Sequence, residues 1–159
     1  RGASVRSASM DEVRQLYRAR AALEGICAAE FALKATDEQR QQLAELAAEM
    51  ERCVEGGAPE KFGQLNSDWH SLLMRGAGNP VIEDIVKRLN TPVHHLLFET
   101  FYRGDRLREA ALDHRVIVKA VLDRDGPAAE QAMRQHIENG HRFLTDLDRA
   151  VHHGGNGEI

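Results

Sequence analysis

The chain has 159 residues, 42% of them hydrophobic, which is enough for one domain with a buried core. A net charge of −4 and an isoelectric point near 6.1 argue against a nucleic-acid-binding surface, because phosphate binding requires clustered Lys and Arg side chains. No run approaches the roughly 18 apolar residues of a membrane span, and no signal peptide is visible. We therefore expect a soluble, cytoplasmic protein without a membrane partner.

Apolar residues recur at helical spacing along most of the sequence, and no segment alternates between apolar and polar residues as a half-buried strand does. The pattern predicts six helices: one from Met10 to about Lys34, one opened by the capping box Thr36-Asp37-Glu38-Gln39 and closed at Gly56-Gly57, one from Pro59 to Gly76, one from Pro80 to Phe101, and two joined at Gly126-Pro127. Pro92 interrupts the fourth helix without changing its apolar phase, which predicts a kink or a short break there. We expect an all-α fold, an antiparallel bundle of about six helices.

The last two helices carry one histidine each on the apolar face. His114 lies 11 residues before Asp125 and His136 lies 11 residues after it. In two antiparallel helices these side chains would stand at the same height, about 16 Å from the turn. Burying an imidazole without a partner costs on the order of 1–3 kcal/mol, so two that face each other indicate a shared partner. For either residue alone, a hydrogen-bonded core histidine is the simpler interpretation.

A third histidine lies in the helix that begins at Pro59. Asn66 and His70 are four residues apart and so share one helix face, where both could reach a single ion. Taken alone, such a pair at the rim of an apolar stripe is common. Together with His114 and His136, however, it gives three imidazoles and one amide oxygen on facing helices. This set suits Zn²⁺ or Ni²⁺, with Mn²⁺ as a further alternative, and leaves coordination positions open.

The first helix places Arg20 and Glu24 among apolar neighbours. An ion pair between residues four apart explains both, and it is the interpretation that the residues alone favour. The alternative is an inward guanidinium that binds an anion, since the planar fork of Arg matches a carboxylate. Because the four candidate metal ligands are neutral, the ion would keep its 2+ charge and attract an anion whose other end Arg20 could hold.

Two further interpretations remain open. A small metal-dependent hydrolase could use a three-histidine site with an open position, with Glu24 or Asp113 as general base. Against it, the sequence has no HExxH arrangement that couples a base to the ligands. The third interpretation is a purely structural bundle with buried, hydrogen-bonded histidines.

These residues, in this order, resemble the FCD-type effector-binding domain that follows the winged helix in GntR-family bacterial transcription regulators. The matching landmarks are Arg20-Ala-Ala-Leu-Glu24, Asn66-Ser-Asp-Trp-His70, Ala77-Gly-Asn-Pro80, and the run His114, Ile117, Ala120, Asp123 or Asp125, Ala129, Met133 and His136. The opening Arg-Gly-Ala-Ser-Val resembles the last strand of the β-hairpin of a winged helix. The resemblance covers nearly the whole chain.

The resemblance implies a ligand set and an effector. A divalent metal would be bound by Asn66, His70, His114 and His136, and a small carboxylate or sugar acid would bind at the metal with help from Arg20. Many members of the family carry Asp where this chain has Asn66. A neutral ligand lowers the affinity for a cation, so metal occupancy is less secure here than in an Asp-bearing relative.

The resemblance also implies a division of the chain and a role. Residues 1–9 would be a linker or the remnant of a winged-helix DNA-binding domain, residues 10–151 the effector-binding and dimerisation domain, and residues 152–159 a flexible tail. The protein would be a homodimer that is not an enzyme. It would contact DNA only through the N-terminal domain that this chain lacks.

Overall fold

The computed structural model describes residues 8–153, and all regular secondary structure in that range is helical. The seven helices are α1 (Met10–Lys34), α2 (Asp37–Gly56), α3 (Pro59–Gly76), α4 (Pro80–Asn90), α5 (His94–Thr100), α6 (Gly104–Leu122) and α7 (Gly126–His153). The predicted all-α bundle is confirmed, and α4 and α5 together replace the single fourth helix. Most of the predicted linker and tail lies in residues 1–7 and 154–159, outside the described residues.

The helix boundaries follow local capping chemistry. Ser9 and Glu12 form a capping box at the start of α1, and Thr36 and Gln39 form the predicted one at the start of α2. Gly57 ends α2 in the left-handed conformation, with a φ of 62°, which a glycine adopts without steric cost. These caps satisfy backbone groups that a helix end otherwise leaves unpaired.

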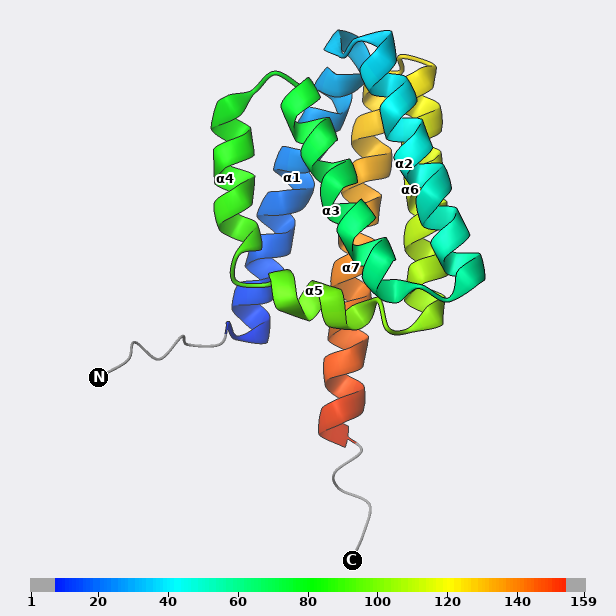
Figure 1. Cartoon of the computed structure of the whole chain (residues 1–159). Coiled ribbons are helices and arrows are strands. Elements are labelled where there is room, and N and C mark those ends of the chain that lie inside the picture. Colours follow the sequence, from blue (N-terminus) through cyan, green and yellow to red (C-terminus); the bar gives the residue numbers. More distant parts are fainter. Residues whose placement is uncertain (1–7, 154–159) are drawn as a thin grey trace, which may run out of the picture.

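The predicted interruption at Pro92 is a complete break. The chain leaves the helix after Asn90, turns through residues 91–93, and starts α5 at His94. Helix α4 runs along α1, whereas α5 crosses the end of the bundle and packs on α7 (Figure 1). Because of the break, the apolar residues of the predicted fourth helix pack on two different helices, those of α4 on α1 and those of α5 on α7.

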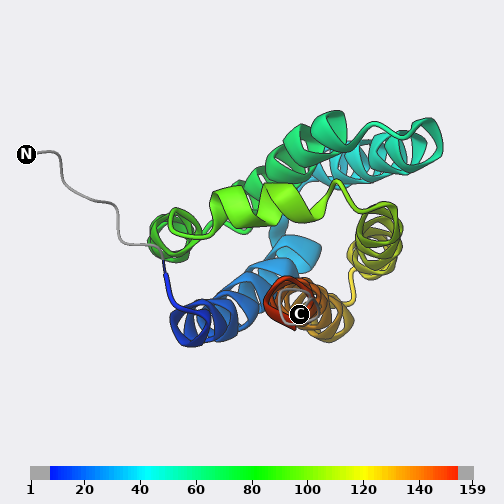
Figure 2. The same ribbon diagram turned by 90° about the horizontal axis from the view of Figure 1, so that it is seen from below.

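The helices surround a single interior. Helix α1 packs most extensively on α7, α2 packs on both α3 and α6, and α6 packs on α7. Seen from below, α1 and α7 form one side of the bundle, α2 and α3 form the opposite side, and α6 joins them (Figure 2). None of the helices within residues 8–153 is long and apolar enough to cross a bilayer.

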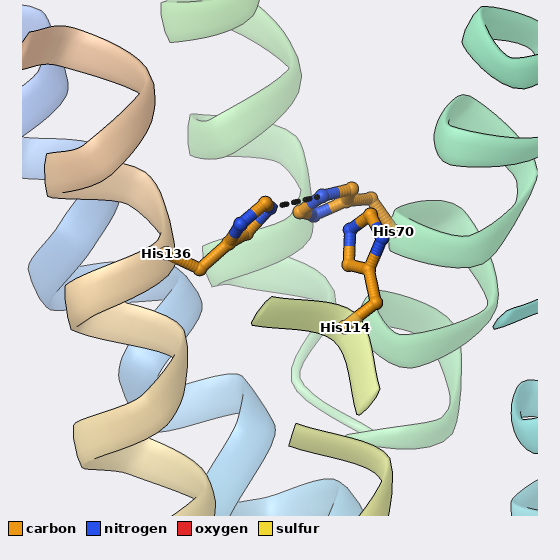
Figure 3. A group of neighbouring side chains, drawn as sticks. All are labelled: His70, His114 and His136. Atoms are coloured by element: carbon orange, nitrogen blue, oxygen red, sulfur yellow. Dashed lines mark hydrogen bonds between the residues drawn. The ribbon is translucent and has the colours of Figure 1, made fainter. Parts of the chain in front are cut away.

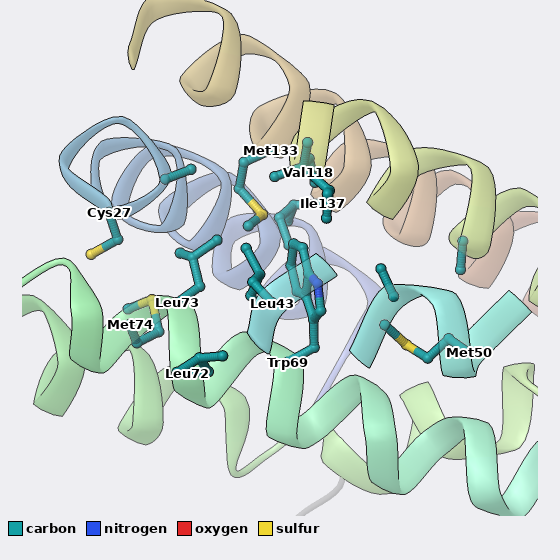
Figure 4. Close-up of a cluster of buried hydrophobic side chains, with 14 of the residues drawn as sticks. Cys27, Leu43, Met50, Trp69, Leu72, Leu73, Met74, Val118, Met133 and Ile137 are labelled. Carbon is teal, nitrogen blue, oxygen red and sulfur yellow. The ribbon is translucent and has the colours of Figure 1, made fainter. Parts of the chain in front are cut away.

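Large apolar side chains fill the space between these layers (Figure 4). The most deeply buried include Phe31, Leu43, Met50, Trp69 and Met133, contributed by α1, α2, α3 and α7. Each such side chain contributes about 1.5–3 kcal/mol by leaving water. This apolar core fixes the helices that carry the polar side chains of the site.

Candidate metal centre

Three histidines from three helices meet inside the bundle. His70 of α3, His114 of α6 and His136 of α7 each offer a ring nitrogen within 4.8 Å of the other two (Figure 3). The ring centroids of His114 and His136 are 4.6 Å apart. The two side chains therefore stand at the same height above the turn, as their equal sequence separation from Asp125 predicts. The structure thus brings together the three histidines that were predicted to face the interior of the bundle.

The proton on His136 is positioned by a carboxylate. Its Nδ1 lies 3.1 Å from Oδ2 of Asp113, and Asn139 donates to both oxygens of the same carboxylate. Burial raises the pKa of Asp113, but Asn139 donates to both of its oxygens, as suits an ionised carboxylate. Such a carboxylate only accepts hydrogen bonds, so Nδ1 of His136 carries the hydrogen and Nε2 of the ring has the lone pair. Burial, followed by the nearby His70 and Arg106, lowers the pKa of His136 well below its usual value, so the ring is neutral.

His70 is positioned in the same way by Glu24. Its Nδ1 lies 2.9 Å from Oε2 of Glu24, whose other oxygen accepts a 2.9 Å hydrogen bond from Nε of Arg20. Burial alone would raise the pKa of Glu24, but the charge of Arg20 and the bond with His70 outweigh it and lower the pKa to about 2. Glu24 is therefore ionised, and Nδ1 of His70 carries a hydrogen that it donates to Glu24. The predicted Arg20–Glu24 ion pair is confirmed, and both side chains are buried.

His114 has no hydrogen-bond partner for either ring nitrogen, although the residue is completely buried. Its ring packs on Trp69, with centroids 4.4 Å apart. Burial, followed by the proximity of His136 and His70, lowers its pKa well below the usual value. An unsatisfied buried polar group costs about 1–3 kcal/mol, which a bound cation would remove.

These nitrogens fit a divalent metal. The Nε2 atoms of His70 and His136 face each other at 3.4 Å (Figure 3), and in rings that carry their hydrogen on Nδ1 both atoms present a lone pair to a cation. Two imidazole ligands of a tetrahedral zinc ion, each at 2.0–2.1 Å, are roughly 3.3 Å apart. The Oδ1 atom of Asn66 is also buried and unpartnered. Neutral imidazoles and an amide oxygen suit Zn²⁺ or Ni²⁺ better than Mn²⁺, which prefers oxygen ligands.

The cluster borders a narrow cavity of about 10 Å³, room for about one water molecule, which is partly open to solvent. Polar side chains on its wall come from four helices: Tyr17, Arg20, Asn66, His70, Arg106 and His136. A second pocket, between α3 and α4, shares Arg20, Asn66 and His70 with it. The predicted anion-binding Arg20 therefore lies beside two of the three histidines, with Asn66 on the same wall.

The carboxylates proposed as general bases have another role. Both oxygens of Glu24 are engaged, by Arg20 and His70, and both oxygens of Asp113 accept from Asn139 while one also contacts His136. Each carboxylate faces the Nδ1 side of a histidine, away from the cluster. Their contacts with Nδ1 set the orientation of the rings of His70 and His136.

Arg106 is a cavity residue that the sequence argument does not select. Its only sequence signal is spacing: Arg106, Ala110 and His114 are four residues apart and share one face of α6. The predicted apolar stripe of this helix includes Leu107 and Ala111 and so leaves Arg106 at its edge. Packing of α6 on α7 turns that edge inward, and Arg106 is 2% exposed.

Inside the helical bundle, His70 and His136 of the histidine cluster line a narrow cavity, an arrangement suited to binding a small ligand. The chain belongs to the FCD domain family, whose model matches residues 15–139. The resemblance to the effector domains of GntR-family transcription regulators is thereby confirmed.

Individual relatives agree with this assignment. The HTH-type transcriptional repressor RspR of Escherichia coli (strain K12) is 28% identical over 138 residues, which cover 87% of this chain and 60% of RspR. Streptococcus agalactiae GntR is a structural neighbour with a TM-score of 0.70 and 28% identity, covering 84% of this chain and 60% of the neighbour. E. coli McbR/YncC shares the fold with a TM-score of 0.78 at 17% identity, over 89% of this chain and 71% of that one. This chain spans about 60% of the length of RspR.

Proposed function

We propose that the chain is the effector-sensing domain of a GntR-family transcription regulator that binds a divalent cation and a small organic acid. His70, His114, His136 and the amide oxygen of Asn66 would hold the cation. One observation carries this proposal: one ring nitrogen from each of three histidines, on three different helices, lies within 4.8 Å of the other two. In two of them, Glu24 and Asp113 fix the tautomer that this requires.

The effector is proposed to be a carboxylate or a sugar acid. With four neutral ligands, a bound cation keeps its full charge and attracts an anion into the cavity. Arg20 lines that cavity, and its ion pair with Glu24 sets the orientation of its guanidinium plane. The terminal nitrogens of Arg20 would hold the carboxylate.

The output is proposed to be a change in DNA binding. The ligand set joins α3, α6 and α7, and Arg20 adds α1, so occupancy of the cavity couples four helices. In a homodimer, a shift among these helices would alter how two winged-helix domains, which lie outside this chain, are presented to DNA. The relatives are transcriptional regulators, which supports a cytoplasmic role other than catalysis.

Metal titration tests the first step. After treatment with EDTA, the chain is titrated with Zn²⁺ and with Ni²⁺, followed by calorimetry and by native mass spectrometry. We expect one equivalent to bind, with quenching of the fluorescence of Trp69, which is the only tryptophan and packs on His114.

Two alanine variants control this titration. His114→Ala removes one nitrogen of the cluster and is expected to lose stoichiometric binding, whereas His94→Ala, at an exposed histidine of α5, is expected to retain it. Absence of uptake by the unmodified chain at neutral pH, or equal uptake by both variants, would overturn the metal assignment.

A further inference from the structure

Arg106 carries a buried charge that the proposed function does not use. The residue is 2% exposed, and its Nε and Nη1 atoms have no hydrogen-bond partner. Burying a guanidinium without partners is strongly unfavourable, since both its charge and its donors lose water. Two donor nitrogens of this guanidinium therefore remain available to a hydrogen-bond acceptor on a bound ligand.

The neighbours of Arg106 confirm that its charge is not balanced at close range. The Oε2 atom of Glu109, which belongs to a 40% exposed side chain, is 3.7 Å from Nη1, beyond hydrogen-bond distance. Asp113 is engaged by Asn139 and His136. The other close groups are the rings of Phe101 and Phe143, whose centroids lie 5.9 and 6.0 Å from the guanidinium carbon.

The backbone of α7 leaves room for this guanidinium. A Cβ atom at Gly140 would lie 3.1 Å from Nη2 of Arg106, so a side chain at this position would press on the group. Gly140 and Arg106 border the same cavity as Arg20 and the histidines His70 and His136. The unpartnered donors of Arg106 therefore belong to the proposed effector site.

The charges around the cavity differ in how they are balanced. Glu24 neutralises Arg20 within one ion pair, so that residue adds little net charge. Arg106 has only the 3.7 Å contact with the partly exposed Glu109, and it lies on the same cavity wall as His70 and His136. A ligand with a single carboxylate at the cation would leave this second guanidinium unpaired.

We propose that the cavity binds a dicarboxylate, with one carboxylate at the histidine cluster and Arg20 and the second at the unpartnered nitrogens of Arg106. This inference rests on the proposed function and specifies its ligand class. The planar fork of Arg106 matches a carboxylate, and such charge-assisted bonds are the strong ones. The narrow cavity at Arg106 adjoins the pocket of about 100 Å³ with which it shares Arg20, Asn66 and His70, so a ligand that spans the two must have a short carbon chain.

Matched acids test the proposal. The chain loaded with one equivalent of Zn²⁺ is titrated by calorimetry with malonate, succinate and glutarate, and with propionate, butyrate and valerate as monocarboxylates of the same lengths. At one or more lengths we expect the dicarboxylate to bind about tenfold or more tightly than its monocarboxylate partner. Arg106→Gln is expected to bring this ratio to within about twofold of one and to leave monocarboxylate affinity unchanged.

Two variants control for charge and folding. Arg108→Gln removes the same charge from an exposed position of α6 and is expected to keep the full ratio. Arg106→Lys retains a charge without the fork, so it folds with the site closer to native and is expected to give an intermediate ratio.

The outcomes separate this inference from the function on which it rests. If monocarboxylates bind and dicarboxylates bind no better, or if the preference survives in Arg106→Gln, the dicarboxylate site is wrong and the acid-sensing function stands. If no acid of either kind binds to the zinc-loaded chain, both are wrong.

Discussion

The interior of the bundle has two regions that meet at Trp69. On one side lies the apolar core of Figure 4, with side chains such as Leu43 and Met50. On the other side the same ring touches His114, and the walls carry buried polar atoms without partners, on Asn66 and Arg106 as well. The first region stabilises the fold by removing hydrocarbon from water, whereas the second costs stability. Buried polar atoms without partners indicate a binding site, because a bound ligand would supply the hydrogen-bond partners that the protein lacks there.

Within the polar region, we expect the largest loss of stability when the buried ion pair between Arg20 and Glu24 is broken. Glu24→Gln leaves Arg20 buried without its carboxylate, and we expect unfolding to become easier by about 3–5 kcal/mol. Urea denaturation followed by circular dichroism measures this difference. Asp11→Asn breaks an exposed pair on the same helix and should leave the midpoint unchanged. Equal midpoints for both variants would contradict a structural role for the buried pair.

A cavity in the apolar region should affect stability alone. Leu43→Ala removes a completely buried side chain and is expected to cost about 2–5 kcal/mol of unfolding free energy, without changing zinc stoichiometry. Leu33, which is 61% exposed, provides the control, since Leu33→Ala should change stability by less than about 0.5 kcal/mol. Loss of zinc binding in folded Leu43→Ala would show that the two regions are not separable.

The hydrogen bond behind His136 should tune metal affinity more than stability. In Asp113→Asn the new amide can turn its NH₂ group to Nδ1 of His136, which would move the ring proton to Nε2. We expect zinc affinity to fall by about 10–100-fold, measured by competition with a chelator. Asp123→Asn, at an exposed position near the end of α6, should have native affinity. If Asp113→Asn binds zinc as tightly as the unmodified chain, the assigned tautomer is wrong.

The smallest effect that we expect comes from a substitution at Asn66, in the polar region. Asn66→Asp adds a negative ligand of the same shape, which should raise zinc affinity by about fivefold to tenfold. The buried carboxylate should destabilise the metal-free chain at the same time. Thermal unfolding with and without zinc checks both signs. Unchanged affinity would remove Asn66 from the ligand set.

Local sequence signals were sufficient for most of the fold. The capping box at Thr36 and the Gly126-Pro127 junction mark helix ends through groups a few residues apart, and these signals act before any tertiary contact forms. At Pro92 the sequence leaves a kink and a break as alternatives. The packing of α5 on α7 decides between them, and this contact is not local.

In the candidate site too, local helix geometry was predictable from the sequence, whereas contacts between distant helices were not. His114 and His136 could be placed because they are equidistant from one turn, and helix geometry converts that symmetry into proximity. The contact of Glu24 with His70 spans 46 residues and depends on how α1 packs against α3. The inward position of Arg106 depends on the rotation of α6. No single-helix pattern encodes either of these.

The three imidazoles are spread over residues 70–136, on helices that are distant along the chain. A cation held by them would tie α3, α6 and α7 together as a covalent cross-link does, and it would have no comparable site in the unfolded chain. Its binding energy would then add to the stability of the native state in proportion to the logarithm of the free metal concentration. The amount of folded protein in a cell would consequently follow metal supply, in addition to any effect of a bound acid.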